Sequence, residues 1–156
     1  MPPDLQLFDI LRRHGVPFVA IGGHAVNAHG FRRATEDTDV IWLRSAQAEA
    51  SLMSALTEID ARYIGRQIDP ATGIEQTYPV TLPYVQANRL MMLWTNQGFL
   101  DLFDYIPGLP SEPVDSLFAT SIEIDGVRYP TLEWLRRMKT ASGRSKDLLD
   151  LENLPD

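Results

Sequence analysis

The chain has 156 residues, of which 44% are apolar and 22% are charged, proportions that disfavour disorder, fibrous repeats and disulfide-rich scaffolds. With 14 Lys and Arg against 21 Asp and Glu, the formal charge is -7, which argues against a broad nucleic-acid-binding surface. The length predicts a single domain over residues 1–156.

The chain contains no cysteine. This excludes disulfides, thiolate zinc sites and cysteine nucleophiles, so any metal ion must have oxygen or imidazole ligands. The N-terminal Met1-Pro-Pro-Asp4 lacks the basic start and apolar core of a signal peptide, and no apolar run reaches the roughly 18 residues of a membrane span. These features predict a cytoplasmic protein without a membrane partner.

The first part of the chain predicts alternating helices and strands. Apolar residues at helical spacing indicate a short helix that begins near Leu5 and ends before Gly15. The β-prone run 18–21 leads through two glycines into a short helix, and residues 39–43 predict a second strand. Ser45 is a suitable N-cap for an amphipathic helix that extends to residue 59.

The middle of the chain, residues 60–88, contains several prolines and predicts irregular strands and loops. Segments 89–94 and 99–106 then indicate a β-hairpin, because a glycine-containing turn separates two β-prone runs. Three large side chains of this hairpin are expected in the core, namely Met91, Met92 and Trp94.

The C-terminal part predicts a small hairpin over residues 122–129 that turns at Asp125-Gly126. A helix follows, which Gly143 ends, and Ser145 is the expected N-cap of a last helix. That last helix contains three leucines, Leu148, Leu149 and Leu151.

Two glycines and two acids form the most informative motif. Gly22 and Gly23 leave a strand and open a helix, so backbone N–H groups can face an anion without a Cβ in the way. Strand alternation places Asp37 and Asp39 on one face, about 7 Å apart. Such oxygen ligands prefer Mg²⁺ or Mn²⁺, which orient triphosphates during in-line displacement. A plain tight turn and a solvated acidic turn remain the alternatives.

Other charged residues are candidates for the same site. Asp101 lies between leucines in an apolar strand, and Asp104 lies on the opposite face, so only one of the two can join the site. Between Arg128 and Lys146, six basic residues stand against one acid, which makes this segment either the counter-charge for a bound nucleotide or a solvated helix face. Asp147 is either a first-turn helix residue or lies at the edge of the site.

The glycine pair, the short helix and the Asp-x-Asp at the start of a strand resemble the DNA polymerase β-type nucleotidyltransferase superfamily. Arg33-Ala-Thr35 and segment 139–152 resemble, more narrowly, small nucleotidyltransferase-like proteins related to abortive-infection toxins of bacterial toxin–antitoxin systems. The resemblance implies an α+β, two-layer nucleotidyltransferase fold with a mixed β-sheet flanked by helices. It covers roughly residues 16–43, 98–108 and 126–154.

The resemblance also implies roles for the residues that match its motifs. Asp37, Asp39 and Asp101 would be the catalytic acids that hold Mg²⁺ or Mn²⁺, and Asp101 would help to deprotonate the attacking hydroxyl. The sequence departs from the pattern at Gly23, where many members have serine, and at Thr38, where an apolar residue is usual. The expected phosphate-binding residues are Gly22, Gly23, Arg33, Lys139 and Arg144.

The implied activity is the Mg²⁺-dependent transfer of a nucleoside monophosphate from a nucleoside triphosphate to an acceptor hydroxyl, with release of pyrophosphate. The acceptor stays open among tRNA, a protein and a small molecule, and a cognate antitoxin protein is a further expected partner. Two alternatives stand beside this hypothesis. One is a catalytically inactive nucleotidyltransferase-fold module of a toxin–antitoxin pair, and the other is a metal-free structural domain.

Overall fold

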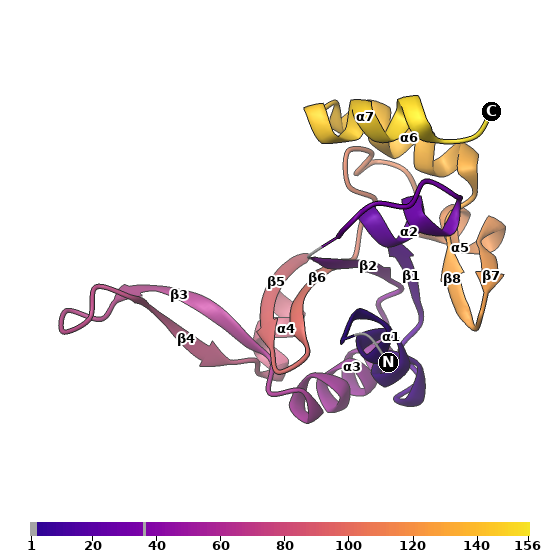
Figure 1. Cartoon of the computed structure of the whole chain (residues 1–156). Helices are drawn as coiled ribbons and strands as arrows, with labels where there is room; N and C mark the ends of the chain where they lie inside the picture. Colours follow the sequence, from indigo (N-terminus) through magenta and orange to yellow (C-terminus); the bar gives the residue numbers. More distant parts are fainter. Residues whose placement is uncertain (1–2, 36) are drawn as a thin grey trace.

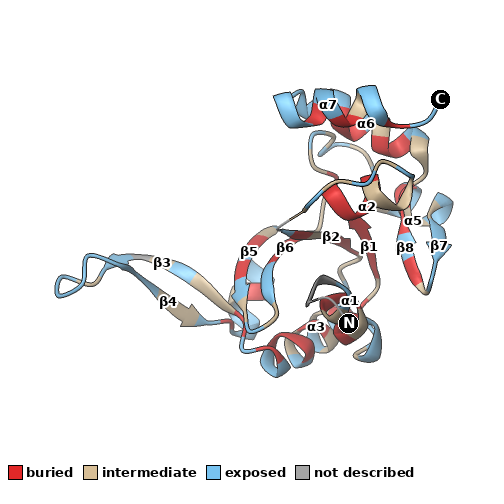
Figure 2. Ribbon diagram, in the orientation of Figure 1, coloured by how far each residue is buried: buried red, intermediate tan, exposed pale blue. Residues whose placement is uncertain are grey.

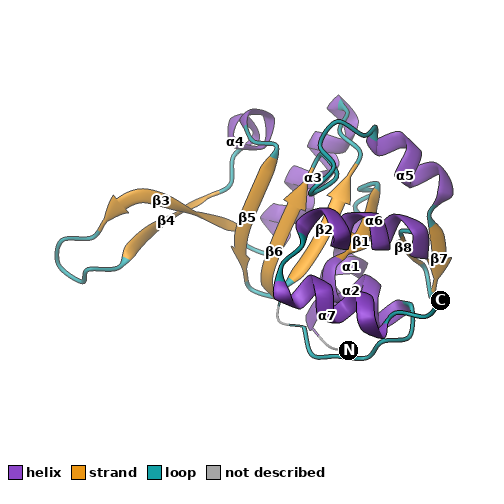
Figure 3. Cartoon of the chain, turned by 90° about the horizontal axis from the view of Figure 1, so that it is seen from above, coloured by secondary structure: helices purple, strands orange, loops and turns teal. Residues whose placement is uncertain are grey.

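The structure is a computed structural model that describes residues 3–35 and 37–156, so Met1 and Pro2, part of the N-terminal segment considered above, lie outside the described residues. Within the described ranges, six strands form one sheet in the order β1-β2-β6-β5-β3-β4, and two strands form a separate hairpin. The sheet is mixed, because β2 and β6 run parallel whereas the other neighbouring strands run antiparallel. Figures 1 and 3 show helices flanking this sheet, which confirms the predicted α+β class.

The N-terminal elements follow the predicted order. They are α1 (Pro3–Arg13), β1 (Phe18–Ile21), α2 (Gly22–Ala28), β2 (Thr38–Trp42) and α3 (Ala46–Glu58). The side chain of Ser45 accepts a hydrogen bond from the N–H of Ala48, so the predicted N-cap of α3 is confirmed.

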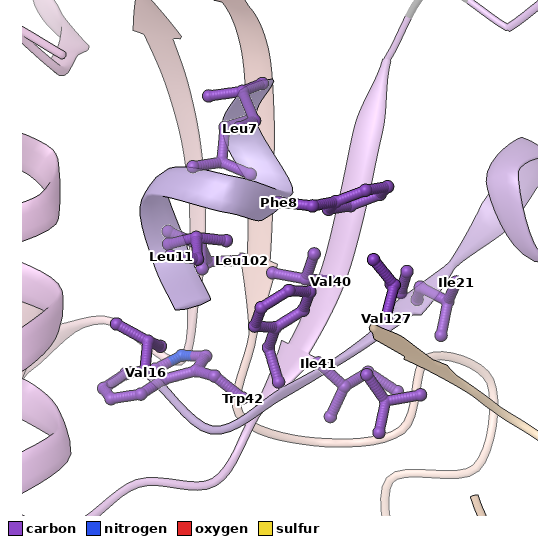
Figure 4. Close-up of a cluster of buried hydrophobic side chains, with 14 of the residues drawn as sticks. Leu7, Phe8, Leu11, Val16, Ile21, Val40, Ile41, Trp42, Leu102 and Val127 are labelled. Carbon is purple, nitrogen blue, oxygen red and sulfur yellow. The ribbon is translucent and has the colours of Figure 1, made fainter. Parts of the chain in front are cut away.

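The core next to β2 holds the acid-bearing strand in place. Figure 4 shows Leu7, Phe8 and Leu11 of α1 beside Val40 and Trp42 of β2, and these five side chains are almost fully buried. Burial of an aliphatic or aromatic side chain of this size stabilises the fold by about 1.5–3 kcal/mol. Because the inner face of β2 is packed in this way, its other face presents Asp39 in a defined position.

The middle of the chain is more regular than predicted. It forms the hairpin β3 (Arg62–Ile68) and β4 (Glu75–Pro79), followed by α4 (Leu82–Ala87). Tyr63 stacks on Tyr84, with ring centroids 4.0 Å apart, and this contact joins the base of the hairpin to α4. Beyond it, the hairpin projects as an arm from the rest of the molecule (Figure 1).

The predicted central hairpin is confirmed as β5 (Leu90–Thr95) and β6 (Gly98–Phe103). The core prediction is right for Met91, which is buried, but wrong for Met92 and Trp94, which are 62% and 49% exposed. The reason is strand alternation, since the two exposed side chains point to a face of the sheet that is left open. Figure 2 shows exposed stretches beside buried ones on β5 and β6.

The C-terminal part contains α5 (Val114–Thr120), which the sequence did not indicate, and then the predicted hairpin β7 (Ile122–Ile124) and β8 (Val127–Tyr129). Next come α6 (Leu132–Ser142), which ends at a left-handed Gly143, and α7 (Ser145–Asn153). The predicted N-cap is wrong by one residue, because α7 already starts at Ser145 and Arg144 is the cap.

Helix α7 turns acids inward. Asp147 and Asp150 are buried, whereas Leu148 and Leu149 are about half exposed. In the described part of the chain, no helix combines the length and apolar composition that crossing a bilayer requires.

Candidate functional site

Two carboxyl groups meet where β2 and β6 run side by side. Asp39 of β2 is the register partner of Asp101 of β6, and both residues are half-buried. Facing residues of neighbouring strands project to the same side of a sheet, and here the two side chains are joined by a hydrogen bond. A hydrogen bond between two carboxyl groups requires that one of them be protonated, so it forms only while the pair holds a proton.

The surroundings of this acid pair favour the protonated form. Burial, together with the charge of Asp39 and the hydrogen bond to it, raises the pKa of Asp101 to about 7. Burial also raises the pKa of Asp39, although the hydrogen bond to Asp101 and the charge of Lys146 act in the opposite direction. One carboxyl group of the pair therefore releases its proton near neutral pH.

The glycine pair lies directly against the acids. A Cβ at Gly22, which has a positive φ of 66°, would be 2.5 Å from Oδ2 of Asp39. A Cβ at Gly23 would be 2.5 Å from Oγ1 of Thr35 and 3.1 Å from Nη1 of Arg33. Both distances of 2.5 Å are too short for a carbon–oxygen contact, so only glycine fits at these two positions in the structure as it stands.

A cavity of about 300 Å³ lies over the acids and the glycines. The structure brings every predicted site residue to this one cavity. Asp37 lies at its exposed rim, just before β2 begins. The predicted residues that line the cavity are Gly22, Gly23, Arg33, Asp37, Asp39, Asp101, Lys139 and Arg144.

Three of the predicted phosphate ligands already have carboxylate partners. Lys139 lies 2.9 Å from Asp150 and 3.2 Å from Asp147. Arg33 donates two hydrogen bonds to Asp150, at 2.7 and 3.0 Å, and the side chain of Arg144 donates two to Asp147, at 2.8 and 3.3 Å. These five residues form one ion-pair network, which ties the loop before β2 to α6 and α7.

Both carboxylates of this network have a pKa below the usual value of an aspartate. Burial alone raises the pKa of Asp150, but hydrogen bonds from Arg33 and Lys139 outweigh it and lower the pKa below its usual value. Burial likewise raises the pKa of Asp147, and the hydrogen bond from Arg144 and the charge of Lys139 reverse the effect. Three cations and two anions leave a net charge of +1 beside the cavity.

Sequence reasoning assigned no role to Asp150 and left Lys146 out of the site. The basic segment itself contains a single acid, Glu133. Asp147 and Asp150 follow the segment at a spacing that places both on one face of a helix, where they can pair with its cations. Lys146 lines the cavity, and within residues 3–35 and 37–156 no carboxylate lies within ion-pair distance of it. Its charge acts on Asp39.

Asp104, which the sequence allowed as the alternative to Asp101 at the site, has a structural role. It accepts hydrogen bonds from Arg44 at 2.8 Å and from Arg89 at 2.9 Å. It is absent from the residues that line the cavity. His29 is also engaged elsewhere, because its Nε2 lies 2.8 Å from the carbonyl oxygen of Pro130.

The donor set suits a small divalent cation. Mg²⁺ is commonly held by one or two carboxylates and completes its shell with water and substrate phosphates. Asp39 and Asp101 would supply such a pair, and Asp37, on the exposed rim, would supply a further carboxylate. Among the described residues no three Asp, Glu or His side chains are already grouped as a complete metal site, and the two paired acids instead bind each other.

No family model matches the chain, and no curated protein matches it. Among solved structures, JHP933 from Helicobacter pylori is similar over 95% of this chain, with 17% sequence identity and a TM-score of 0.49. The chain spans 62% of the length of JHP933. At this level of identity and TM-score, the likeness assigns neither a family nor an activity to the chain.

Proposed function

We propose that the protein has a nucleotidyltransferase fold and is a Mg²⁺-dependent nucleotidyltransferase. The observation that carries this proposal is the pair of hydrogen-bonded carboxyl groups of Asp39 and Asp101, which faces a cavity lined by Gly22, Gly23 and a cluster of cations. A cavity lined by both acids and cations suits a metal-bound triphosphate, whose phosphates need both kinds of partner.

In the proposed reaction, the oxygen of an acceptor hydroxyl attacks the α-phosphorus of a nucleoside triphosphate. A new oxygen–phosphorus bond forms, and the bond from the α-phosphorus to the bridging oxygen breaks, so that pyrophosphate leaves with the bonding electrons. Asp101, which lines the cavity beside Asp39, takes the hydroxyl proton.

The other residues bind and orient the substrate. Lys146 and Arg144 line the cavity with exposed side chains and are placed to contact phosphate oxygens. Lys139 is buried within the ion-pair network, where it adds positive charge and holds α7 against α6. When Mg²⁺ or Mn²⁺ is bound by the three acids, it neutralises phosphate charge.

Calorimetry with Mg²⁺ and each of the four ribonucleoside triphosphates tests the proposal. We expect the wild-type protein to bind at least one of them and Asp39→Ala to bind none. Asp115→Asn removes an exposed acid of α5 outside the cavity and is expected to behave as wild type. Equal binding by the wild-type and Asp39→Ala proteins would exclude the proposed site.

A second function has one observation in its favour. Because Arg33, Lys139 and Arg144 are already paired with carboxylates, the scaffold is stable without a nucleotide, as a catalytically inactive binding module requires. Absence of nucleoside triphosphate binding by the wild-type protein at millimolar ligand would favour this function.

We further propose that the protein belongs to a toxin–antitoxin pair, on the strength of the resemblance to abortive-infection toxins. If the transfer reaction is toxic, expression of the wild-type protein in a bacterial host should arrest growth, and Asp39→Ala should not. Growth arrest by both proteins would separate toxicity from the acid pair, and co-expression with a cognate antitoxin protein should relieve it.

A further inference from the structure

A second cavity, of about 890 Å³, lies between α1, α2, the loop that follows α2 and the β7–β8 hairpin. We call it the lateral cavity, and we call the cavity over the acid pair the site cavity. The two share one lining residue, Arg33, and none of the three acids of the proposed metal site lines the lateral cavity. Cavities of roughly 300–1,000 Å³ are common as small-molecule sites, so the lateral cavity is large enough to hold a ligand of its own.

Much of the lateral cavity is apolar or aromatic. The rings of Phe8 and His24 meet edge to face, with centroids 5.2 Å apart, and both residues are buried. Tyr129 is buried beside the same space, whereas the aliphatic side chains of Leu5 and Ile124 are 42% and 37% exposed. Buried rings together with accessible aliphatic side chains suit the uncharged body of an organic ligand.

Two arginines, Arg12 and Arg32, distinguish the lateral cavity from the rest of the surface. Every other arginine whose side chain the structure describes donates at least one hydrogen bond to a protein acceptor. Within the described residues, the guanidinium groups of Arg12 and Arg32 have no such partner, and both line this cavity. Because guanidinium groups match the oxygens of phosphate and carboxylate groups, the pair points to an anionic ligand.

The guanidinium group of Arg12 is positioned by the hairpin rather than by a carboxylate. A Cβ at Gly126 would lie 2.7 to 2.9 Å from Nη1, Cζ and Nη2 of Arg12, so the guanidinium group rests directly against the β7–β8 turn. A donor group that is already in place loses less conformational entropy when it binds an anion.

The remaining charged side chains of the lining leave the excess charge positive. Arg33 and Asp9 already have ion-pair partners. Asp125, at the hairpin turn, has none in the part of the chain that the structure describes, so two unpaired cations stand against one unpaired anion. A phosphate monoester carries a charge of about −1.5 to −2 at neutral pH, which matches two guanidinium groups better than the single charge of a carboxylate does.

We propose that the lateral cavity binds an organic phosphate monoester. Its phosphate group accepts hydrogen bonds from Arg12 and Arg32, and its uncharged body lies against Leu5, Ile124 and the buried rings. The inference does not depend on the proposed nucleotidyl transfer, because the acid pair lines the site cavity and not this one.

Calorimetry of the full chain with phenyl phosphate tests the inference. This probe joins a phosphate monoester to an apolar ring. We expect it to bind about tenfold or more tightly than inorganic phosphate, which has no ring to bury, and phenol, which has no phosphate, to bind more weakly still. Added salt should weaken the binding, because exposed guanidinium groups supply most of the attraction.

Variants locate the bound probe. Arg12→Gln and Arg32→Gln should each weaken phenyl phosphate binding by about tenfold or more, because each removes charged hydrogen bonds. Arg32→Lys keeps the charge without the planar pair of donors and should bind better than Arg32→Gln. Ile124→Ser should reduce the preference for phenyl phosphate over inorganic phosphate.

Lys146→Ala is the matched control, since it removes a cation that lines the site cavity but not the lateral cavity. It should leave phenyl phosphate binding unchanged. The urea midpoints of the two glutamine variants should equal that of the wild type, because neither substitution breaks an ion pair among the described residues, so that lost binding is not lost folding.

Four results would overturn the inference. They are no phenyl phosphate binding at millimolar ligand, binding that survives both glutamine substitutions, binding that Lys146→Ala abolishes, and tighter binding of phenylacetate than of phenyl phosphate. The third result would assign the probe to the site cavity, and the fourth would make the ligand a carboxylate. Failure of the protein to bind nucleoside triphosphates would contradict the proposed function and leave this inference standing.

Discussion

Asp39 and Asp101 face each other across the parallel strands β2 and β6, and the raised pKa of Asp101, about 7, lets the two carboxyl groups hold one proton between them below neutral pH. Mg²⁺ binds the ionised forms, so its binding must displace that proton. We expect Mg²⁺ binding near pH 6.5 to release protons, with fewer released at pH 8, because the pKa of Asp101 is about 7.

Calorimetric titration of the protein with Mg²⁺ in buffers of different ionisation enthalpy measures this release. In Asp101→Asn the shared proton is missing, so the apparent binding enthalpy should become independent of the buffer. A buffer-independent enthalpy in the wild-type protein at pH 6.5 would show that the acids do not share a proton.

The same raised pKa predicts how the stability of the metal-free protein depends on pH. Between about pH 4 and pH 7 the native state binds more protons at Asp101 than the unfolded state, so the free energy of unfolding falls as pH rises. The lowered pKa values of Asp147 and Asp150 act in the opposite direction, but only as pH falls below about 4. Urea unfolding at pH 5 and pH 8 measures the difference, and Asp101→Asn should reduce it.

The order of elements could be predicted because local signals specify it. The glycine turn after β1, Ser45 before α3 and Gly143 after α6 each act over a few residues. Asp37 and Asp39 could be assigned to one site because they are only two positions apart in the chain, although β2 begins only at Thr38.

Features that depend on what covers a face could not be predicted. The sequence of β5 is apolar on both faces, but the structure buries Met91 and Leu93 on one face and leaves Met92 and Trp94 exposed on the other. The inward direction of Asp150 depends on Arg33, which is 117 positions away in the chain. No local sequence pattern predicts such a pairing. The leucines of α7 instead suggest an apolar inner face, although Leu148 and Leu149 are about half exposed.

Gly23 is expected to tolerate no side chain unless Thr35 changes as well. A Cβ at this position would be 2.5 Å from Oγ1 and 2.7 Å from Cβ of Thr35, whose hydroxyl also donates a hydrogen bond to the carbonyl oxygen of Asp37. Gly23→Ala should therefore destabilise the fold by about 1–3 kcal/mol and displace the rim acid Asp37. Urea unfolding and nucleoside triphosphate binding measure the two effects.

A double-mutant cycle identifies the cause. Thr35→Gly removes the two nearest of the three atoms that the new Cβ would meet and leaves only Nη1 of Arg33 at 3.1 Å, so Gly23→Ala should cost much less stability in that background. Equal costs in the two backgrounds would mean that the contact with Thr35 is not what excludes a side chain at Gly23.

Asp150 is expected to be the most sensitive member of the ion-pair network. It is fully buried and neutralises both Arg33 and Lys139, so Asp150→Asn leaves two largely buried cations with one remaining carboxylate. Removing one partner of a buried ion pair costs about 3–5 kcal/mol. The side chain of Arg144 is 71% exposed, so Arg144→Ala should cost only about 0–1 kcal/mol although it breaks a pair in the same network. Thermal unfolding of the two variants measures the contrast, and equal losses would contradict it.

Substitution of Lys146 is expected to weaken nucleotide binding without affecting the stability of the fold. Lys146 is exposed, lines the cavity, and its charge acts on Asp39. Loss of a charged hydrogen bond to phosphate costs about 1.5–3 kcal/mol, so Lys146→Ala should weaken binding of Mg²⁺ and nucleoside triphosphate by roughly 10- to 100-fold. The free energy of unfolding of the Lys146→Ala variant should stay within about 0.5 kcal/mol of wild type, because the substitution breaks no ion pair among the described residues. Lys146→Arg keeps the charge and should restore most of the affinity.

If instead Lys139→Met weakened binding without loss of stability and Lys146→Ala had no effect, the phosphate ligand would be the buried lysine, and the network around Asp150 would have to open for substrate to bind.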